Sequence, residues 1–256
     1  MKPILCISFA SAALIAAGCA TSPLGRSQLK LVSDDQMAQM GVAAFRDMQK
    51  KVPRSIDERQ NRYVTCVANA ITNEIQEQRT WEVEVFNDKQ VNAFALPGGK
   101  IGVYSGLLKV AVTQDQLAAV IGHEVSHVLA GHSSERMSQQ MVGDVGTTVV
   151  SAATGVDAQA LGVAANVFFL LPFSRTQETE ADLLGLDLMS MAGFNPEGAI
   201  ALWQNMSHAG GEHPPEMLST HPADQSRIRE LNNRLPKARQ LYQHARESGL
   251  RPGCSA

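Results

Sequence analysis

The hydrophobic positions of this chain recur at helical spacing over much of its length and alternate only in a short stretch. Apolar side chains return every three or four positions over residues 34–50 and 57–78, which predicts two amphipathic helices. Residues 81–86 alternate between apolar and polar, and residues 100–107 follow a Pro-Gly-Gly turn. Both patterns favour β-strands. The first half of the chain therefore predicts two helices followed by a small sheet.

Capping boxes mark the two most regular helices. Thr113-x-x-Gln116 precedes an apolar run that ends near Gly131, and Ser174-x-x-Gln177 precedes a second helical stretch. A Ser or Thr with Gln three residues later satisfies the first backbone N–H groups of a helix. The pattern as a whole predicts an α+β fold that is mainly α-helical.

The segment between the capped helices has a different composition. Residues 135–172 carry few charges, and glycines are scattered among their apolar residues. We interpret them as weak helices with flexible joints, which could form a lid over a cleft. Towards the carboxyl end, His221-Pro222 is expected to open a further helix.

The amino terminus has the form of an export signal. A positive start, Met1-Lys2, is followed by an apolar or small stretch over residues 4–17, which indicates a secretory signal peptide over residues 1–18. The small residues before Cys19 resemble a bacterial lipobox, so we expect acylation at Cys19 and a lipidated extended leader over residues 19–31. Ordinary signal-peptidase cleavage nearby is the alternative. Residues 32–256 then form the globular domain.

Composition excludes several classes of protein. The 256 residues are 44% hydrophobic, and 22 Lys+Arg against 25 Asp+Glu give a net charge of −3, so no nucleic-acid partner is expected. The cysteines form no C-x-x-C pair, which leaves His and carboxylate side chains to hold any metal. With the signal removed and Cys19 modified, we expect a disulfide between Cys66 and Cys254. Two unrelated thiols are the alternative.

The helix after the first capping box contains the sequence His-Glu-Val-Ser-His at residues 123–127. His123 and His127 differ by about 40° around an α-helix, so both imidazoles lie on one side and can share one ion. Glu124 lies beside them, where its carboxylate can act as a general base on water in peptide hydrolysis. The alternative is a histidine pair that only packs on a core helix.

A catalytic zinc usually has three protein ligands, and the second capped helix offers the third. Glu178 and Asp182 lie four positions apart on one face. We expect Glu178 to be the third ligand and Asp182 to accept a hydrogen bond from a ligand histidine; a charged helix face is the alternative. Glu180 is expected to be solvated, and His132, about 180° around the helix from His123, to face away from the metal.

These motifs in combination resemble the HtpX-like zinc metallopeptidases, which include a periplasmic, outer-membrane-associated branch. The resemblance rests on the His-Glu-x-x-His and Glu-x-x-x-Asp motifs, on Asn-Ala-Phe-Ala-Leu-Pro-Gly-Gly at residues 92–99, and on Ser-Thr-His-Pro at residues 219–222 followed by Arg227. It implies a zincin-like fold of the gluzincin type, with the small sheet next to the His-Glu-x-x-His helix. It also implies one zinc ion per chain.

The resemblance implies a substrate-binding edge as well. Residues 92–99 would enter an edge strand beside the cleft, where an extended peptide can add by backbone pairing. Asn92, Ala93 and Phe94 would contact that peptide. His221 would lie near the metal, where it would either stabilise the oxyanion or occupy the open zinc position. A helix N-cap is the alternative for His221.

The expected function is that of a zinc metalloendopeptidase of the bacterial cell envelope that cleaves unfolded or misassembled membrane proteins in quality control. The alternative is a chaperone-like assembly lipoprotein with a latent or structural zinc site. The expected location is the periplasm, with an outer-membrane anchor at Cys19. The expected partners are membrane-protein substrates and other envelope proteases or assembly factors.

Overall fold

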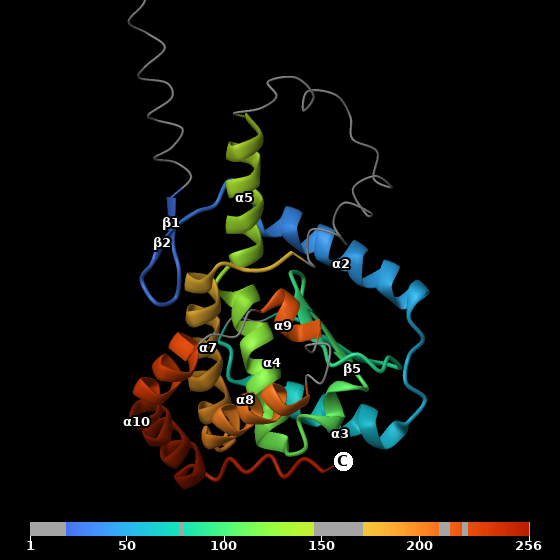
Figure 1. The fold of residues 1–256 in the computed structure, drawn as a ribbon, viewed down its shortest axis with the longest axis vertical. Helices are drawn as coiled ribbons and strands as arrows, with labels where there is room; N and C mark the ends of the chain where they lie inside the picture. Colours follow the sequence, from blue (N-terminus) through green and yellow to red (C-terminus); the bar gives the residue numbers. More distant parts are fainter. Residues whose placement is uncertain (1–18, 77–78, 146–170, 210–215, 222–224, 256) are drawn as a thin grey trace, which may run out of the picture.

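Helices make up most of the computed structural model, which describes residues 19–76, 79–145, 171–209, 216–221 and 225–255 (Figure 1). The two helices expected first are α2 (Asp34–Lys51) and α3 (Glu58–Asn73). The capped helices are α4 (Gln114–Leu129) and α7 (Arg175–Met191). The remaining elements are α5 (His132–Val145), α8 (Glu197–Ala209), α9 (Glu216–Thr220), α10 (Gln225–Glu247) and a short 3-10 turn, η1 (Leu107–Lys109).

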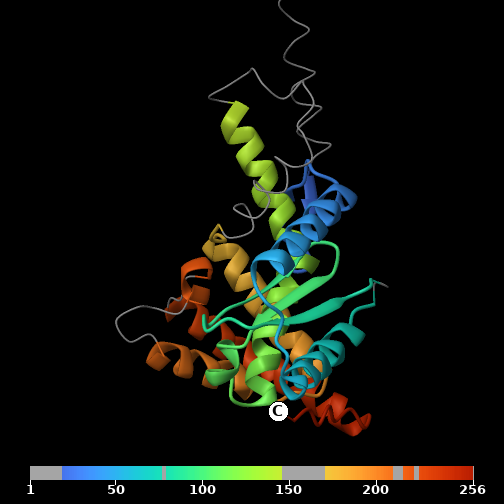
Figure 2. The same ribbon diagram turned by 90° about the vertical axis from the view of Figure 1, so that its right-hand side faces the viewer.

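A three-stranded sheet lies between α2 and α4 (Figure 2). Its strands are β3 (Glu82–Phe86), β4 (Ala93–Leu96) and β5 (Lys100–Tyr104), in the order β3-β5-β4. β5 runs parallel to β3 and antiparallel to β4. The turn between β4 and β5 uses Gly98 and Gly99 at φ angles of 85° and 71°, a region that glycine enters without steric cost. Within the described residues β4 is therefore an edge strand beside α4, as expected.

Helices α4 and α7 approach each other closely. A Cβ atom on Gly122 would lie 2.8 Å from the carbonyl oxygen of Gly185, and a Cβ on Gly185 would lie 2.7 Å from the backbone nitrogen of His123. Both distances are shorter than van der Waals contact, so only glycine fits at either position. α7 also packs against α10 on its other side, and this layering places α7 between α4 and α10 (Figure 1).

The main hydrophobic core lies where α3, α4 and the sheet meet. Its fully buried side chains include Val67 of α3, Ile121 of α4 and Val103 of β5. Burial of each such side chain contributes about 1.5–3 kcal/mol relative to exposure. The core therefore fixes the middle of α4, which carries the His-Glu-x-x-His motif, against α3 and the sheet.

An amino-terminal hairpin lies against α5 and α7. β1 (Cys19–Thr21) pairs with β2 (Ser27–Leu29) in antiparallel register, where the sequence suggested an extended leader. After the hairpin, the backbone N–H of Leu31 donates to Ser138 Oγ at 2.8 Å, and Ser134 Oγ donates to the carbonyl of Val32 at 2.9 Å. Residues 19–32 are therefore held on the domain by specific contacts.

Two expectations for the amino terminus, the signal peptide and the acylation of Cys19, stay predictions. The signal peptide over residues 1–18 lies outside the described residues. Cys19 is exposed at the start of β1 and takes no part in a disulfide, and its acylation stays a prediction. None of the helices in the described part of the chain has the length and apolar character needed to cross a membrane.

The expected lid is described only in part. Residues 135–145 belong to α5, which projects beyond the body of the domain (Figures 1 and 2), whereas residues 146–170 lie outside the described residues.

A disulfide joins Cys66 of α3 to Cys254 near the carboxyl end, the pair that the sequence suggests. Their Cα atoms are 5.8 Å apart, and the sequence separation is 188 residues. The loop that the bridge closes contains the sheet and both capped helices.

Removal of this bridge is expected to lower the free energy of unfolding. A cross-link over such a separation constrains the unfolded chain by about 5 kcal/mol in the chain-entropy description, and measured losses are usually about 2–5 kcal/mol. We expect the double variant Cys66→Ser/Cys254→Ser to lose about 3 kcal/mol in urea unfolding. Cys19→Ser is the control and should unfold like the wild type. Equal stabilities of the double variant and the wild type would contradict the prediction.

Candidate active site

Helix α4 presents His123 and His127 to one space, as its period requires. The two rings are 4.8 Å apart between centroids, and their Nε2 atoms are 3.1 Å apart. Both side chains are buried. Because a core helix fixes both rings, their Nε2 atoms are held at this spacing by the fold.

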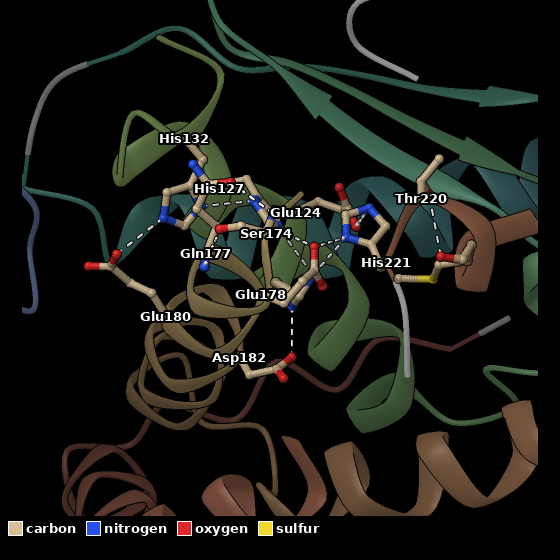
Figure 3. Close-up of polar contacts among 12 residues, drawn as sticks. Glu124, His127, His132, Ser174, Gln177, Glu178, Glu180, Asp182, Thr220 and His221 are labelled. Carbon is tan, nitrogen blue, oxygen red and sulfur yellow. Dashed lines mark hydrogen bonds and ion pairs between the residues drawn. The ribbon is translucent and has the colours of Figure 1, made fainter. Parts of the chain in front are cut away.

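Glu178 enters the same space from the first turn of α7. Its Oε2 lies 3.5 Å from His123 Nε2, and its Oε1 lies 3.5 Å from His127 Nε2. The capping box of Ser174 and Gln177 sets the start of α7 and therefore the direction of this turn. The structure thus brings the carboxylate expected as third ligand to both imidazoles (Figure 3).

His221 completes the group from the end of α9. Its Nδ1 lies 3.1 Å from His123 Nε2 and 3.0 Å from Glu178 Oε1, and its Nε2 lies 3.4 Å from Glu124 Oε1. Its backbone N–H donates to the carbonyl of Met217 at 2.8 Å, so the ring is positioned by α9. The structure therefore places His221 in the centre and in contact with Glu124, with its backbone N–H used by α9.

The donor set and its spacing fit a metal ion. One ligand atom from each of four buried residues lies within 4.8 Å of the others: His123, His127, Glu178 and His221. The separations given above are 3.0–3.5 Å, and tetrahedral ligands at about 2.0–2.1 Å from an ion such as Zn²⁺ lie about 3.3 Å apart. Imidazole nitrogens at this distance either share a proton or bind one cation between them. The cluster can therefore hold a metal.

A buried salt-bridge network surrounds the ligands on the α10 side. Asp182 Oδ1 lies 2.8 Å from His123 Nδ1, as expected, and Arg227 donates to both oxygens of Asp182 at 2.7 and 2.8 Å. Arg227 Nη1 also lies 2.9 Å from Glu178 Oε2, and its guanidinium stacks over the Trp203 ring at 4.4 Å. No role was predicted for Arg227 from the sequence. In the structure Arg227 links Glu178 to Asp182, the residue that contacts His123.

The charges of the site follow from burial and from these contacts. Burial lowers the pKa of His123, but hydrogen bonds to Asp182 and Glu178 outweigh burial and raise the pKa to about 10. Burial raises the pKa of Glu178, yet hydrogen bonds from His123 and His221 hold it well below its ordinary value. The centre therefore attracts positive charge, which a metal ion can supply. Burial also raises the pKa of Glu124, as suits a group that takes up and releases a proton.

Behind His127 the structure differs from one expectation and extends another. Glu180, expected in solvent, is buried, and its Oε2 lies 3.2 Å from His132 Nε2. His132 does not approach the metal centre directly, but its Nδ1 lies 2.9 Å from Nδ1 of His127 (Figure 3). His132 is not in the metal cluster, as expected, but it contacts the far side of His127, because Gly131 at φ 67° ends α4 and α5 starts at His132, whereas the prediction continued α4 past Leu129. The prediction for Glu180 was wrong because the amino-terminal hairpin covers this side chain.

Phe173 was not found from the sequence. Its ring stacks on the ring of His127, with 3.9 Å between the centroids. The guanidinium of Arg136 also lies over the Phe173 ring, 4.2 Å from its centroid. The residue directly precedes the Ser174 cap of α7, and an aromatic before a cap is ordinary core packing, so no sequence signal sets it apart.

A cavity of about 210 Å³ lies beside Glu124 and His221 and is lined by the residues expected to contact substrate. These are Asn92, Ala93 and Phe94. Asn92 is buried, and its Oδ1 accepts a hydrogen bond from the backbone N–H of Ala93 at 2.9 Å. A second cavity, of about 290 Å³, reaches His127 next to Pro97 and Gly98. The first cavity therefore runs along the whole of β4, since Ala93, Phe94, Ala95 and Leu96 all line it, and the second lies beyond the carboxyl end of that strand.

Known proteins with related sequences come from mitochondria and from bacteria. The chain is 36% identical over 184 residues to the mitochondrial metalloendopeptidase OMA1 of Saccharomyces cerevisiae, which covers 69% of this chain and 53% of that protein. It is 41% identical over 160 residues to OMA1 of Schizosaccharomyces pombe, covering 62% of this chain and 48% of that protein. It is 26% identical over 237 residues to the β-barrel assembly-enhancing protease of Escherichia coli (strain K12), covering 88% of this chain and 49% of that protein.

These relatives correct one expectation and set the scope of the others. The two with the higher identities are mitochondrial by name, so the periplasmic location with an outer-membrane anchor, expected from the export signal and the lipobox-like residues before Cys19, is wrong. The chain spans about half the length of these relatives.

The family is shown by a match that covers more than half of the chain. Residues 58–235, which include the sheet, both capped helices and all four groups of the metal cluster, match peptidase family M48. The fold has the expected form, mainly helical with a small sheet next to the His-Glu-x-x-His helix. The chain therefore belongs to peptidase family M48, and its enzyme class, a metallopeptidase, is the one that the motif predicts.

Proposed function

We propose that the chain is a zinc-dependent endopeptidase in which His123, His127 and Glu178 hold one zinc ion and Glu124 is the general base. The observation that carries the proposal is the meeting of three ligand atoms from two helices directly beside a buried carboxylate. Zinc, when bound, supplies a Lewis acid that polarises a carbonyl and makes water more acidic.

The residues of the chain perform the proton transfers and the positioning. Glu124, whose pKa burial raises, takes a proton from the attacking water and delivers it to the leaving amine. Asp182 fixes His123 so that its Nε2 faces the centre. Among the described strands β4 lies at the edge of the sheet, where an extended peptide can add, with Asn92 at one end of it.

The substrate class follows from this mode of binding. A peptide that adds to an edge strand must be extended, and a folded protein rarely offers such a segment. The Escherichia coli relative is named for β-barrel assembly. We therefore infer that unfolded or misassembled membrane proteins are the substrates, cleaved in quality control, and that assembly factors for such proteins are the partners.

His221 supports a resting form of the enzyme. Its Nδ1 faces the centre at ligand spacing, and its Nε2 faces Glu124. Of its two expected roles, this geometry favours the one in which His221 takes the fourth position. Four-ligand zinc sites are usually structural, which is the observation that favours the chaperone alternative. In our proposal the enzyme is latent until α9 moves and frees Glu124 and the fourth position.

Glu124→Gln is expected to abolish cleavage while keeping the fold and the metal. The amide cannot act as a base, so kcat for an unfolded protein should fall by about 10²–10⁴-fold. Zinc content, measured by elemental analysis, should match the wild type, whereas His123→Ala should lose zinc. A purified Glu124→Gln enzyme that digests the protein at the wild-type rate would refute the mechanism.

The same pair of enzymes tests the substrate class. Peptides released from a membrane-protein fraction by the wild type but not by Glu124→Gln should come from unfolded or unassembled membrane proteins. Release mainly from soluble folded proteins would contradict the proposal. A Glu124→Gln variant that still promotes assembly of a membrane protein would favour the chaperone alternative.

His221→Ala separates the two roles of that histidine. If His221 closes the resting site, its removal should raise kcat and lower the dependence of activity on an activating partner. If it instead stabilises the oxyanion, kcat should fall by about 10²–10³-fold. Initial rates on a quenched fluorescent peptide, normalised to zinc content, measure the difference.

Asp182→Asn is expected to weaken zinc binding. The change keeps the shape of the side chain but removes the charge that orients His123 and balances Arg227. Loss of such a partner typically raises the metal dissociation constant by about 10–100-fold, which competition with a chromophoric chelator measures. Asp187→Asn is the matched control, since Asp187 lies on the same helix and pairs with Arg234 instead. Equal dissociation constants for the two variants would contradict the prediction.

A further inference from the structure

The loop of the amino-terminal hairpin docks onto two buried carboxylates. Arg26 makes a bidentate contact with Glu135 of α5, at 2.6 and 2.7 Å, and its Nε donates to Oε2 of Glu180 of α7 at 2.9 Å. Ser22 Oγ and the backbone N–H of Leu24 donate to the other oxygen of Glu180. One arginine therefore connects the hairpin to both helices, 109 and 154 residues away along the chain.

Glu180 connects this dock to the metal centre. Its Oε2 lies 3.2 Å from Nε2 of His132, and Nδ1 of His132 lies 2.9 Å from Nδ1 of His127 (Figure 3). His132 is fully buried, and Glu180 is 4% exposed. Between Arg26 and His127 the structure thus contains a continuous series of side-chain contacts.

The donors and acceptors of this series fit together in one direction. If His127 gives the lone pair of Nε2 to a metal, its Nδ1 carries the proton and donates it to Nδ1 of His132. His132 must then carry its own proton on Nε2, where it donates to Glu180. Glu180 as a carboxylate only accepts, and Arg26 as a guanidinium only donates. Each partner therefore fixes the tautomer of the one before it.

Arg26 also reaches the centre by a second route. Glu135, which it holds with two bonds, accepts from Gln177 Nε2 at 2.8 Å. Gln177 belongs to the capping box of α7 and directly precedes Glu178. The hairpin is therefore connected to the first turn of α7 as well as to His127.

From this geometry we propose that Arg26 is a positioning residue of the metal centre, which acts through Glu180 and His132 to hold His127 in its ligating tautomer and orientation. The proposal rests on the proposed function, because it assumes that His127 ligates zinc. It gives the amino-terminal hairpin a role in the site, so that undocking of the hairpin weakens the metal centre without touching a ligand.

The test compares Arg26→Gln with Arg234→Gln in the full chain. Arg234 is a matched control because it also pairs with a carboxylate of α7, Asp187, and its side chain is 23% exposed against 24% for Arg26. Three quantities are measured: the zinc dissociation constant by chelator competition, the visible spectrum of the cobalt-substituted protein, and the melting temperature of the metal-free form.

We expect Arg26→Gln to raise the zinc dissociation constant by about tenfold, in the range usual for groups that support a ligand. It should also change the cobalt spectrum, which reports the geometry around the ion. Arg234→Gln should leave both unchanged at a similar melting temperature. Glu180→Gln should raise the constant as Arg26→Gln does, and the double variant should add little to either, because both act on one series of contacts.

Two results would overturn the inference. One is a zinc dissociation constant and cobalt spectrum for Arg26→Gln that match those of Arg234→Gln. The other is a fully additive double variant, which would show that Arg26 does not act through Glu180. A wild-type chain that binds no zinc would instead refute the proposed function, so the two failures are distinguishable.

Discussion

The candidate metal centre depends on the close contact between α4 and α7. Its proposed ligands come from two helices that lie about fifty residues apart in the sequence, and a carboxylate can meet two imidazoles only if the helix axes approach closely. Gly122 and Gly185 make that approach possible, since a Cβ at either position would collide with the backbone of the other helix. The core on one side and α10 on the other then press the pair together. The spacing of the proposed ligands thus depends on two glycines, which have no side chain to hold the helices apart.

Electrostatics explain why this contact can be so rich in charge. Burial of a carboxylate is costly unless charges and hydrogen bonds compensate it. Here Arg227 forms salt bridges with Asp182 and Glu178 on one side of the centre, and Arg26 forms one with Glu180 on the other side. The centre itself retains a carboxylate and imidazole nitrogens, a set of groups that suits a cation. The buried charged residues of α4 and α7 are therefore explained by the site that they form.

The parts of the site that follow from helical periodicity were predictable from the sequence. His123 and His127 share a face because they are four positions apart, and the same holds for Glu178 and Asp182. The capping boxes gave the starts of both helices within one residue. The parts that were not predictable depend on places where the chain changes direction and brings distant segments together. His132 returns to His127 only because Gly131 ends α4, and Glu180 is buried only because a hairpin far away in the sequence covers it.

The disulfide has a consequence for the lifetime of the molecule. Peptidases are exposed to cleavage by other copies of themselves, and long connections between helices are the usual places for such cuts. Because Cys66 and Cys254 enclose both ligand-bearing helices, a single break anywhere between them leaves two fragments that remain covalently attached. The residues of the cluster then stay within one covalently linked molecule until a reductant releases the fragments.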